Sequence, residues 1–182
     1  MPATKTITLK TWTAINNLLA YLKNQNHPNH EEYTIEPMRS AHPLLTPGQF
    51  MPAVKKIFEK MLSEKRGGRP IQNLCTLHIL RVPDYSWLTP EERETYARHY
   101  IQTIAPDGLC LYCWHINKGM GSADLNVMVP NVVDLDRPRV RRQRGVNVIT
   151  QARDTADAIT TLINRNRLKK KKTDRHHAPA VA

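Results

Sequence analysis

Apolar residues recur at intervals of three or four positions in four stretches of the chain, which is the spacing of a helix that buries one face. These stretches are residues 12–23, residue 50 to the glycines at 67 and 68, residues 90–103 and residues 152–166. The third has the clearest start, because Thr89 suits an N-cap, Pro90 fits the first turn, and Glu92 completes a capping box. The pattern therefore predicts four helices.

Shorter apolar runs between these stretches have the composition of strands. They are residues 7–9, residues 75–82, residues 109–116 and residues 124–129. The last two flank a turn that contains Gly119 and Gly121, so we expect them to form a hairpin. The order of elements predicts an α+β fold, in which an antiparallel sheet carries its flanking helices on one face.

Three segments follow neither pattern. Residues 24–48 are rich in Asn, His and Pro, and we expect a long loop there. Residues 137–147 are basic and are expected to be irregular. The chain after Leu168 is too polar and charged to pack, so we expect disorder. The predicted organisation is one folded domain, residues 1–168, followed by a basic disordered tail, residues 169–182.

The composition narrows the class of protein. The 182 residues include no stretch that approaches the ~18 apolar residues of a membrane span. The first residues lack the apolar run of a signal peptide, and three cysteines do not suggest a disulfide scaffold. We therefore expect a soluble cytoplasmic protein with one ordinary domain.

The positive charge is concentrated in two places. The net charge is +11, of which residues 137–144 supply +5 and residues 165–182 supply +6. Localised charge of this kind is typical of proteins that bind polyanions, so nucleic acid is the expected partner. The candidate contacts are Arg137, Arg139, Arg141, Arg142, Arg144, Lys169, Lys170, Lys171 and Lys172. The alternative is a tail that only increases solubility.

His115, Asp124 and Asn126 are candidate metal ligands in the predicted hairpin. Asp124 and Asn126 are two positions apart and so lie on the same face of a strand, and pairing across the glycine turn brings His115 near Asp124. One imidazole, one carboxylate and one amide oxygen suit a divalent cation such as Mg or Mn. The alternative interpretation is a polar, half-exposed outer face of the hairpin.

Cys110 and Cys113 form a CxxC motif just before His115. Strand residues three positions apart point to opposite faces, which is unsuitable for chelation. We therefore interpret both cysteines as small buried apolar residues. His176 and His177 are interpreted as solvated residues of the tail.

Tyr21, near the end of the first predicted helix, is a candidate nucleophile. A tyrosine hydroxyl can attack a DNA phosphodiester, and the phosphotyrosine ester conserves the bond energy for a later rejoining step. Tyr33, in the predicted loop, is the next candidate. Tyr21 follows Leu18 by three positions, so the alternative is a role in the core.

Three groups of motifs occur in a characteristic order. They are LLAYLK (residues 18–23), LHILRV followed by LTPEE (residues 77–82 and 88–92), and YCWHIN followed after the glycine turn by DLNVMVPN (residues 112–117 and 124–131). This series resembles the relaxase domain of plasmid mobilization nucleases, in the His-hydrophobic-His endonuclease superfamily. The resemblance covers roughly residues 5–168 and includes the helix over residues 152–166.

The resemblance implies an antiparallel sheet with flanking helices, a bound divalent metal, and nicking of one DNA strand at a transfer origin. The protein would remain joined to the 5′ end through Tyr21. The metal ligands would be His115, Asp124 and Asn126, with His115 also a candidate to orient the tyrosine or relay its proton. Single-stranded origin DNA and other mobilization proteins are the implied partners, and Trp114 is a candidate for stacking on bases.

The chain departs from the family at the metal site, since Asp124 and Asn126 stand where two metal-binding histidines are usual. A second hypothesis is therefore a non-catalytic DNA-binding accessory protein on a degenerate relaxase fold. A third is an unrelated basic α+β module that binds structured RNA or ribosomes. Metal-dependent nicking separates the first two, and preference for single-stranded DNA over duplex RNA separates the third.

Overall fold

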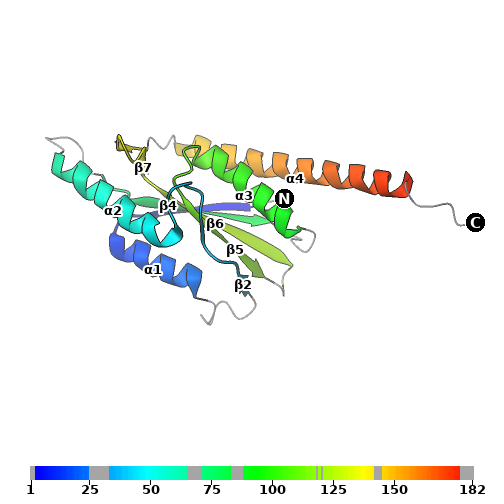
Figure 1. Ribbon diagram of the computed structural model, residues 1–182, viewed down its shortest axis with the longest axis horizontal. Coiled ribbons are helices and arrows are strands. Elements are labelled where there is room, and N and C mark those ends of the chain that lie inside the picture. Colours follow the sequence, from blue (N-terminus) through cyan, green and yellow to red (C-terminus); the bar gives the residue numbers. More distant parts are fainter. Residues whose placement is uncertain are drawn as a thin grey trace, which may run out of the picture.

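The computed structural model describes residues 3–24, 33–64, 71–82, 88–117, 119, 121–141 and 145–176. Within these residues, four helices flank an antiparallel sheet of six strands (Figure 1). This arrangement confirms the predicted α+β class. No helix of the described part is both long and apolar enough to cross a membrane.

The sheet has the strand order β1, β4, β6, β5, β2, and β3 pairs with β5 at a different point from β2. Its strands are β1 (Ala3–Leu9), β2 (Tyr33–Ile35), β3 (Arg39–Ser40), β4 (Cys75–Val82), β5 (Leu111–Asn117) and β6 (Ser122–Pro130). The predicted hairpin of β5 and β6 is confirmed. A separate two-stranded ribbon joins β7 (Val132–Val133) to β8 (Arg139–Val140).

The expected long loop over residues 24–48 is wrong in part. It contains β2 and β3, which pair with the outer side of β5, and α2 already begins at Pro47. Strands of two or three residues are too short to show an alternation of apolar and polar positions in the sequence. They form because the buried backbone N–H and C=O groups on the outer side of β5 must be paired. The expected irregular segment 137–147 likewise contains β8 and the start of α4.

The helices are α1 (Trp12–Lys23), α2 (Pro47–Glu64), α3 (Pro90–Ile104) and α4 (Gly145–His176). The Thr11 side chain caps α1 by accepting a hydrogen bond from the backbone N–H of Ala14 at 3.1 Å. At α3, Thr89 and Glu92 form the predicted capping box. The polar residues before each apolar stripe therefore fix where these two helices begin.

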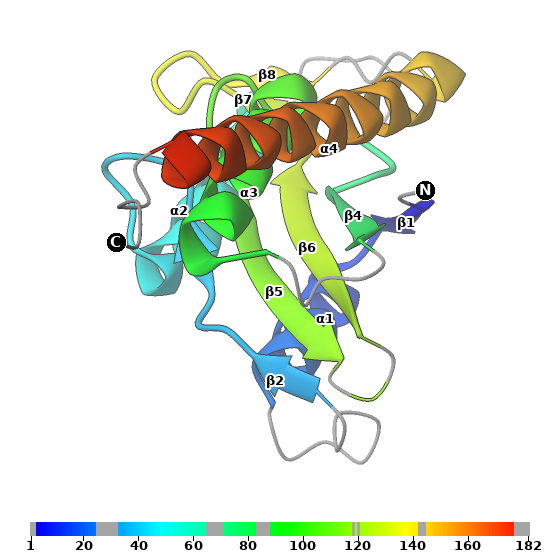
Figure 2. The same ribbon diagram turned by 90° about the vertical axis from the view of Figure 1, so that its right-hand side faces the viewer.

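Helices cover both faces of the sheet, so the expectation of helices on one face is wrong. α3 and α4 pack on one face, called the α3 face here, and α1 and α2 pack on the other, called the α1 face (Figures 1 and 2). The reason lies in the central strands. Leu125 and Val127 of β6 belong to the core on the α3 face, whereas Met128 belongs to the core on the α1 face.

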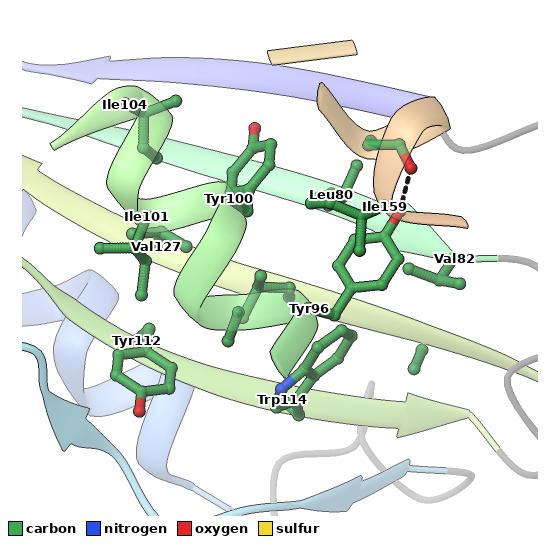
Figure 3. Packing of buried hydrophobic residues seen from close by; sticks show 14 of the residues in the cluster. Leu80, Val82, Tyr96, Tyr100, Ile101, Ile104, Tyr112, Trp114, Val127 and Ile159 are labelled. Atoms are coloured by element: carbon green, nitrogen blue, oxygen red, sulfur yellow. Dashed lines mark hydrogen bonds between the residues drawn. The ribbon is translucent and has the colours of Figure 1, made fainter. Parts of the chain in front are cut away.

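Aromatic residues fill the core between the α3 face and its helices (Figure 3). Tyr96 and Trp114 meet edge to face with ring centroids 6.3 Å apart. The Tyr96 hydroxyl donates a hydrogen bond to the backbone carbonyl of Ala156 at 3.0 Å, which joins α3 to α4. Trp114 is 2% exposed, so it is a core residue and does not present its ring for base stacking.

The last helix is longer than predicted. α4 continues through residues 169–176, where the sequence predicted disorder, and its C-terminal turns extend beyond the other elements (Figure 1). Residues 177–182 lie outside the described part. Lysine has a good helix propensity, and a helix that is already formed adds further residues readily. The basic segment after Leu168 thus continues the fold as a helix up to His176.

Candidate functional site

A row of residues crosses four strands on the α1 face of the sheet. Arg81 of β4 is the register partner of Asp124 in β6, Asp124 is the partner of His115 in β5, and His115 is the partner of Ile35 in β2. Directly opposed residues of antiparallel strands point to the same face. The predicted approach of His115 to Asp124 is therefore confirmed.

Asp124 and His115 of this row are buried, as is Asn126 two positions further along β6, so these three residues do not form a half-exposed outer face. Asp124 is 9% exposed, Asn126 is 5% exposed and His115 is 4% exposed. The C-terminal turn of α1 lies over them, and His115 donates from Nε2 to the backbone carbonyl of Leu22 at 3.1 Å. A carbonyl can only accept, so Nε2 carries a proton in this contact.

Arg81 is a charged residue of this row that the sequence did not reveal. Its Nε and Nη2 donate to the two carboxylate oxygens of Asp124 at 2.8 and 2.9 Å. The Asp124 side chain is 12% exposed, whereas that of Arg81 is 46% exposed. This bidentate pair raises the pKa of Arg81, first through the hydrogen bonds and then through the charge of Asp124. Only the pairing of β4 with β6 places the two residues together.

The predicted metal ligands do not fit a divalent cation in this arrangement. Both carboxylate oxygens of Asp124 are held by a guanidinium, and Nε2 of His115 faces a carbonyl. The side-chain amide of Asn126 donates to the backbone carbonyl of Asp124 at 3.2 Å. Among the described residues, no group of three or more His, Cys, Asp or Glu side chains is placed to hold a metal ion.

Tyr21 and Tyr33 lie beside the row. Tyr21 is partly buried, and its pKa is raised by that burial, then by Tyr33 and then by Asp124. The ring of Tyr33 meets the ring of His115 edge to face, with centroids 6.3 Å apart. The structure thus brings both predicted tyrosines to His115 and Asp124, but the environment of Tyr21 disfavours the phenolate that a nucleophile needs.

The arginine-rich segment divides into structural and exposed residues. Arg141 is a structural residue, contrary to its predicted role, because its side chain is 10% exposed and binds the Asp107 carboxylate at 2.9 Å and the Pro130 carbonyl at 3.1 Å. Arg137 and Arg139 are exposed and stay candidates. Arg142 and Arg144 lie outside the described residues.

Cys110 and Cys113 are free and buried on opposite faces of the sheet. Burial raises the pKa of each thiol to about 12, which keeps both protonated at neutral pH. The interpretation as buried apolar residues is confirmed.

A cavity of about 460 Å³ lies away from the row, between α3 and the β3 segment. Its lining residues are Ser40, Ala41, Glu94, Arg98, Ile101, Gln102, Ala105, Pro106, Gly108 and Tyr112. None of the residues predicted for the metal or the nucleophile takes part in it.

Comparison with protein families and with curated proteins found no match to this chain. The relaxase resemblance is therefore a prediction from the motifs alone.

Proposed function

We propose that this protein binds single-stranded DNA without cutting it, as an accessory protein on a relaxase-like fold. The observation that carries the proposal is the pair of Arg81 and Asp124. In the resemblance, Asp124 would be the anionic ligand of a metal, but here a guanidinium already neutralises that carboxylate from 2.8 Å. A second cation at the same oxygens would be repelled by Arg81 and would compete with its hydrogen bonds.

The distribution of charge supports binding to a polyanion. The net charge of +11 lies in two segments, of which one includes the exposed residues Arg137 and Arg139. The other includes Lys169 to Lys172, and its backbone up to His176 is the C-terminal part of α4. A basic helix that extends from a folded domain can follow a phosphate backbone without reading its bases.

His115 and Tyr21 have roles in this proposal that need no chemistry. His115 ties the end of α1 to the sheet through the Leu22 carbonyl. Tyr21, one position before Leu22, is partly buried and packs against the core on the α1 face. These roles explain why the residues lie together without an activated hydroxyl.

The test is binding of a fluorescently labelled single-stranded oligonucleotide at several salt concentrations. Replacing Lys169, Lys170, Lys171 and Lys172 with Gln should weaken binding and make its salt dependence shallower, by about 0.7 in the log–log slope for each phosphate that the variant no longer neutralises. The matched control replaces Lys10, Lys55, Lys56 and Lys60 with Gln, which removes the same charge from exposed positions elsewhere.

Two results would overturn the proposal. A covalent protein–DNA adduct on a denaturing gel, formed with Mn or Mg and absent in Tyr21→Phe, would establish the nicking enzyme instead. Stronger binding to duplex RNA than to single-stranded DNA would favour the unrelated RNA-binding module.

A further inference from the structure

Three exposed basic residues lie on or beside the α1 face. Lys5 of β1 is the register partner of Ile79, and Arg81 follows Ile79 by two positions on the same face. Lys5 and Arg81 are therefore diagonal neighbours on adjacent strands, within reach of one another's long side chains. Lys23 ends α1, one position after the residue whose carbonyl meets His115. Arg81 is the exposed end of the row on β4, and the exposed Lys5 and Lys23 lie beside the row.

Arg81 is held in one orientation. Asp124 binds Nε and Nη2, which leaves the N–H groups of Nη1 pointing away from the pair on a side chain that is 46% exposed. A planar guanidinium that is fixed on one edge presents its other edge to a ligand without losing further side-chain entropy. Asp124 is mostly covered, so an anion that approaches Arg81 meets the cation first.

Two tyrosines accompany this guanidinium. The ring of Tyr33 meets the ring of His115 edge to face, and Tyr21 lies in the last turn of α1, next to the Leu22 carbonyl that binds His115. Both residues are only partly buried. Tyrosine rings beside a line of cations are typical of sites that bind a single nucleic-acid strand, because bases stack on the rings while the cations follow the phosphates.

We propose that Arg81 binds a backbone phosphate of single-stranded DNA, with Asp124 as its positioning residue and with Lys5 and Lys23 as flanking contacts. The Arg81 guanidinium would thus supply the positive charge that the resemblance assigns to a metal. The inference rests on the proposed function, since it names where on the fold the strand lies.

The experiment compares the parent with the double variant Arg81→Gln, Asp124→Asn, in which two neutral amide groups replace the ion pair and no buried charge is left alone. The matched control is Arg39→Gln, Glu94→Gln, which removes another partly exposed pair at the far edge of the sheet, where Arg39 donates to Glu94 at 2.8 Å. Binding of a labelled single-stranded oligonucleotide is measured against salt, with and without EDTA, and folding is checked by circular dichroism.

We expect the double variant Arg81→Gln, Asp124→Asn to bind several-fold more weakly than the parent, with a log–log salt slope shallower by about 0.7. The control double variant should match the parent in affinity and slope. Arg81→Lys should keep the slope but reduce the affinity, because a point charge does not replace the oriented fork. EDTA should have no effect on the parent.

The outcomes distinguish a failure of the proposed function from a failure of the inference about Arg81. A parent that does not bind single-stranded DNA would overturn the proposed function and this inference together. A parent that binds, with the Arg81 double variant unchanged in affinity and slope, would overturn this inference alone. Loss of binding in EDTA would place a metal ion where we place the guanidinium, and would also overturn it.

Discussion

The two faces of strand β6 bury different kinds of side chain: apolar ones on the α3 face, and polar ones at the candidate site on the α1 face. On the α3 face, Leu125, Val127 and Val129 are buried among aromatic residues. On the α1 face, Asp124 is buried between Arg81 and His115, and Asn126 is buried with its amide on the Asp124 carbonyl. The apolar pattern on this face of β6 returns only at Met128. Both faces are covered, so burial alone does not identify a site. A candidate site is indicated by polar side chains that are buried at positions where apolar side chains would be buried at lower cost in free energy.

The comparison is tested most strongly by truncating one residue on each face. Leu125→Ala should lower the free energy of unfolding by about 2–5 kcal/mol, because Leu125 is fully buried and its neighbours cannot close the cavity. Asn126→Ala on the opposite face should cost about 1 kcal/mol, the value of its hydrogen bond to the Asp124 carbonyl. Urea denaturation measures both. Equal losses of stability in the two variants would contradict the expectation that the apolar residues on the α3 face contribute more to stability than the polar residues on the α1 face.

His78 is a buried histidine on the α3 face, since its register partner is Val127. Burial, with a smaller contribution from Arg141, lowers its pKa from 6.5 to about 4. Between these values the unfolded chain takes up a proton that the folded protein does not, so stability should fall as the pH falls from 6.5 to 4.

Relative to the parent, His78→Leu should remove up to about 3 kcal/mol of that acid destabilisation. Urea denaturation at about pH 7 and about pH 4.5 measures the difference, since the two conditions lie on either side of most of this titration. The same pH dependence in both proteins would show that the pKa of His78 is not lowered by folding.

Arg81→Gln should destabilise the fold by about 1–2 kcal/mol, because it leaves the largely covered Asp124 carboxylate without its cation. The added change Asp124→Asn should recover most of that loss, since the remaining pair is neutral. Thermal or urea denaturation of the parent, both single variants and the double variant gives the coupling energy. If the changes in unfolding free energy of the two single variants add up to that of the double variant, Arg81 and Asp124 do not stabilise each other.

Tyr21→Phe should have the smallest effect. It keeps the ring and removes only the hydroxyl, so the loss of stability should be no more than about 1 kcal/mol and binding of single-stranded DNA should be unchanged. A fluorescence binding assay and a urea titration test this. A large loss of binding would show that the hydroxyl contacts DNA directly.

The sequence predicts the parts of the fold that depend on neighbours in the chain. The capping box of Thr89 and Glu92 and the hairpin of β5 and β6 are local patterns, and both are confirmed. The pairing of His115 with Asp124 follows from that hairpin. The approach of Tyr21 to Asp124 is predicted only by the family resemblance, and the structure does place the two close together.

The remaining features depend on contacts that a linear pattern does not contain. Arg81 meets Asp124 only because β4 and β6 are neighbours, although 43 positions separate them in the chain. Arg141 looks like the other arginines of its segment, and only its contacts with Asp107 and Pro130 make it structural. The sequence does not predict helices on both faces, because two polar residues share one side of β6 with Met128 and so resemble a solvent-facing strand.

The contact between Arg167 and Glu92 fixes where α4 leaves the domain, because the Arg167 side chain donates from Nε to the Glu92 carboxylate at 2.8 Å. The same carboxylate also caps α3. Beyond this point, residues 169–176 add about 12 Å of helix at about 1.5 Å per residue. A stiff extension keeps this basic segment at a set separation from Arg81, unlike a flexible tail. Under the proposed function, single strands too short to reach both the basic end of α4 and Arg81 gain little from the second contact, and affinity rises in a step once the strand spans both.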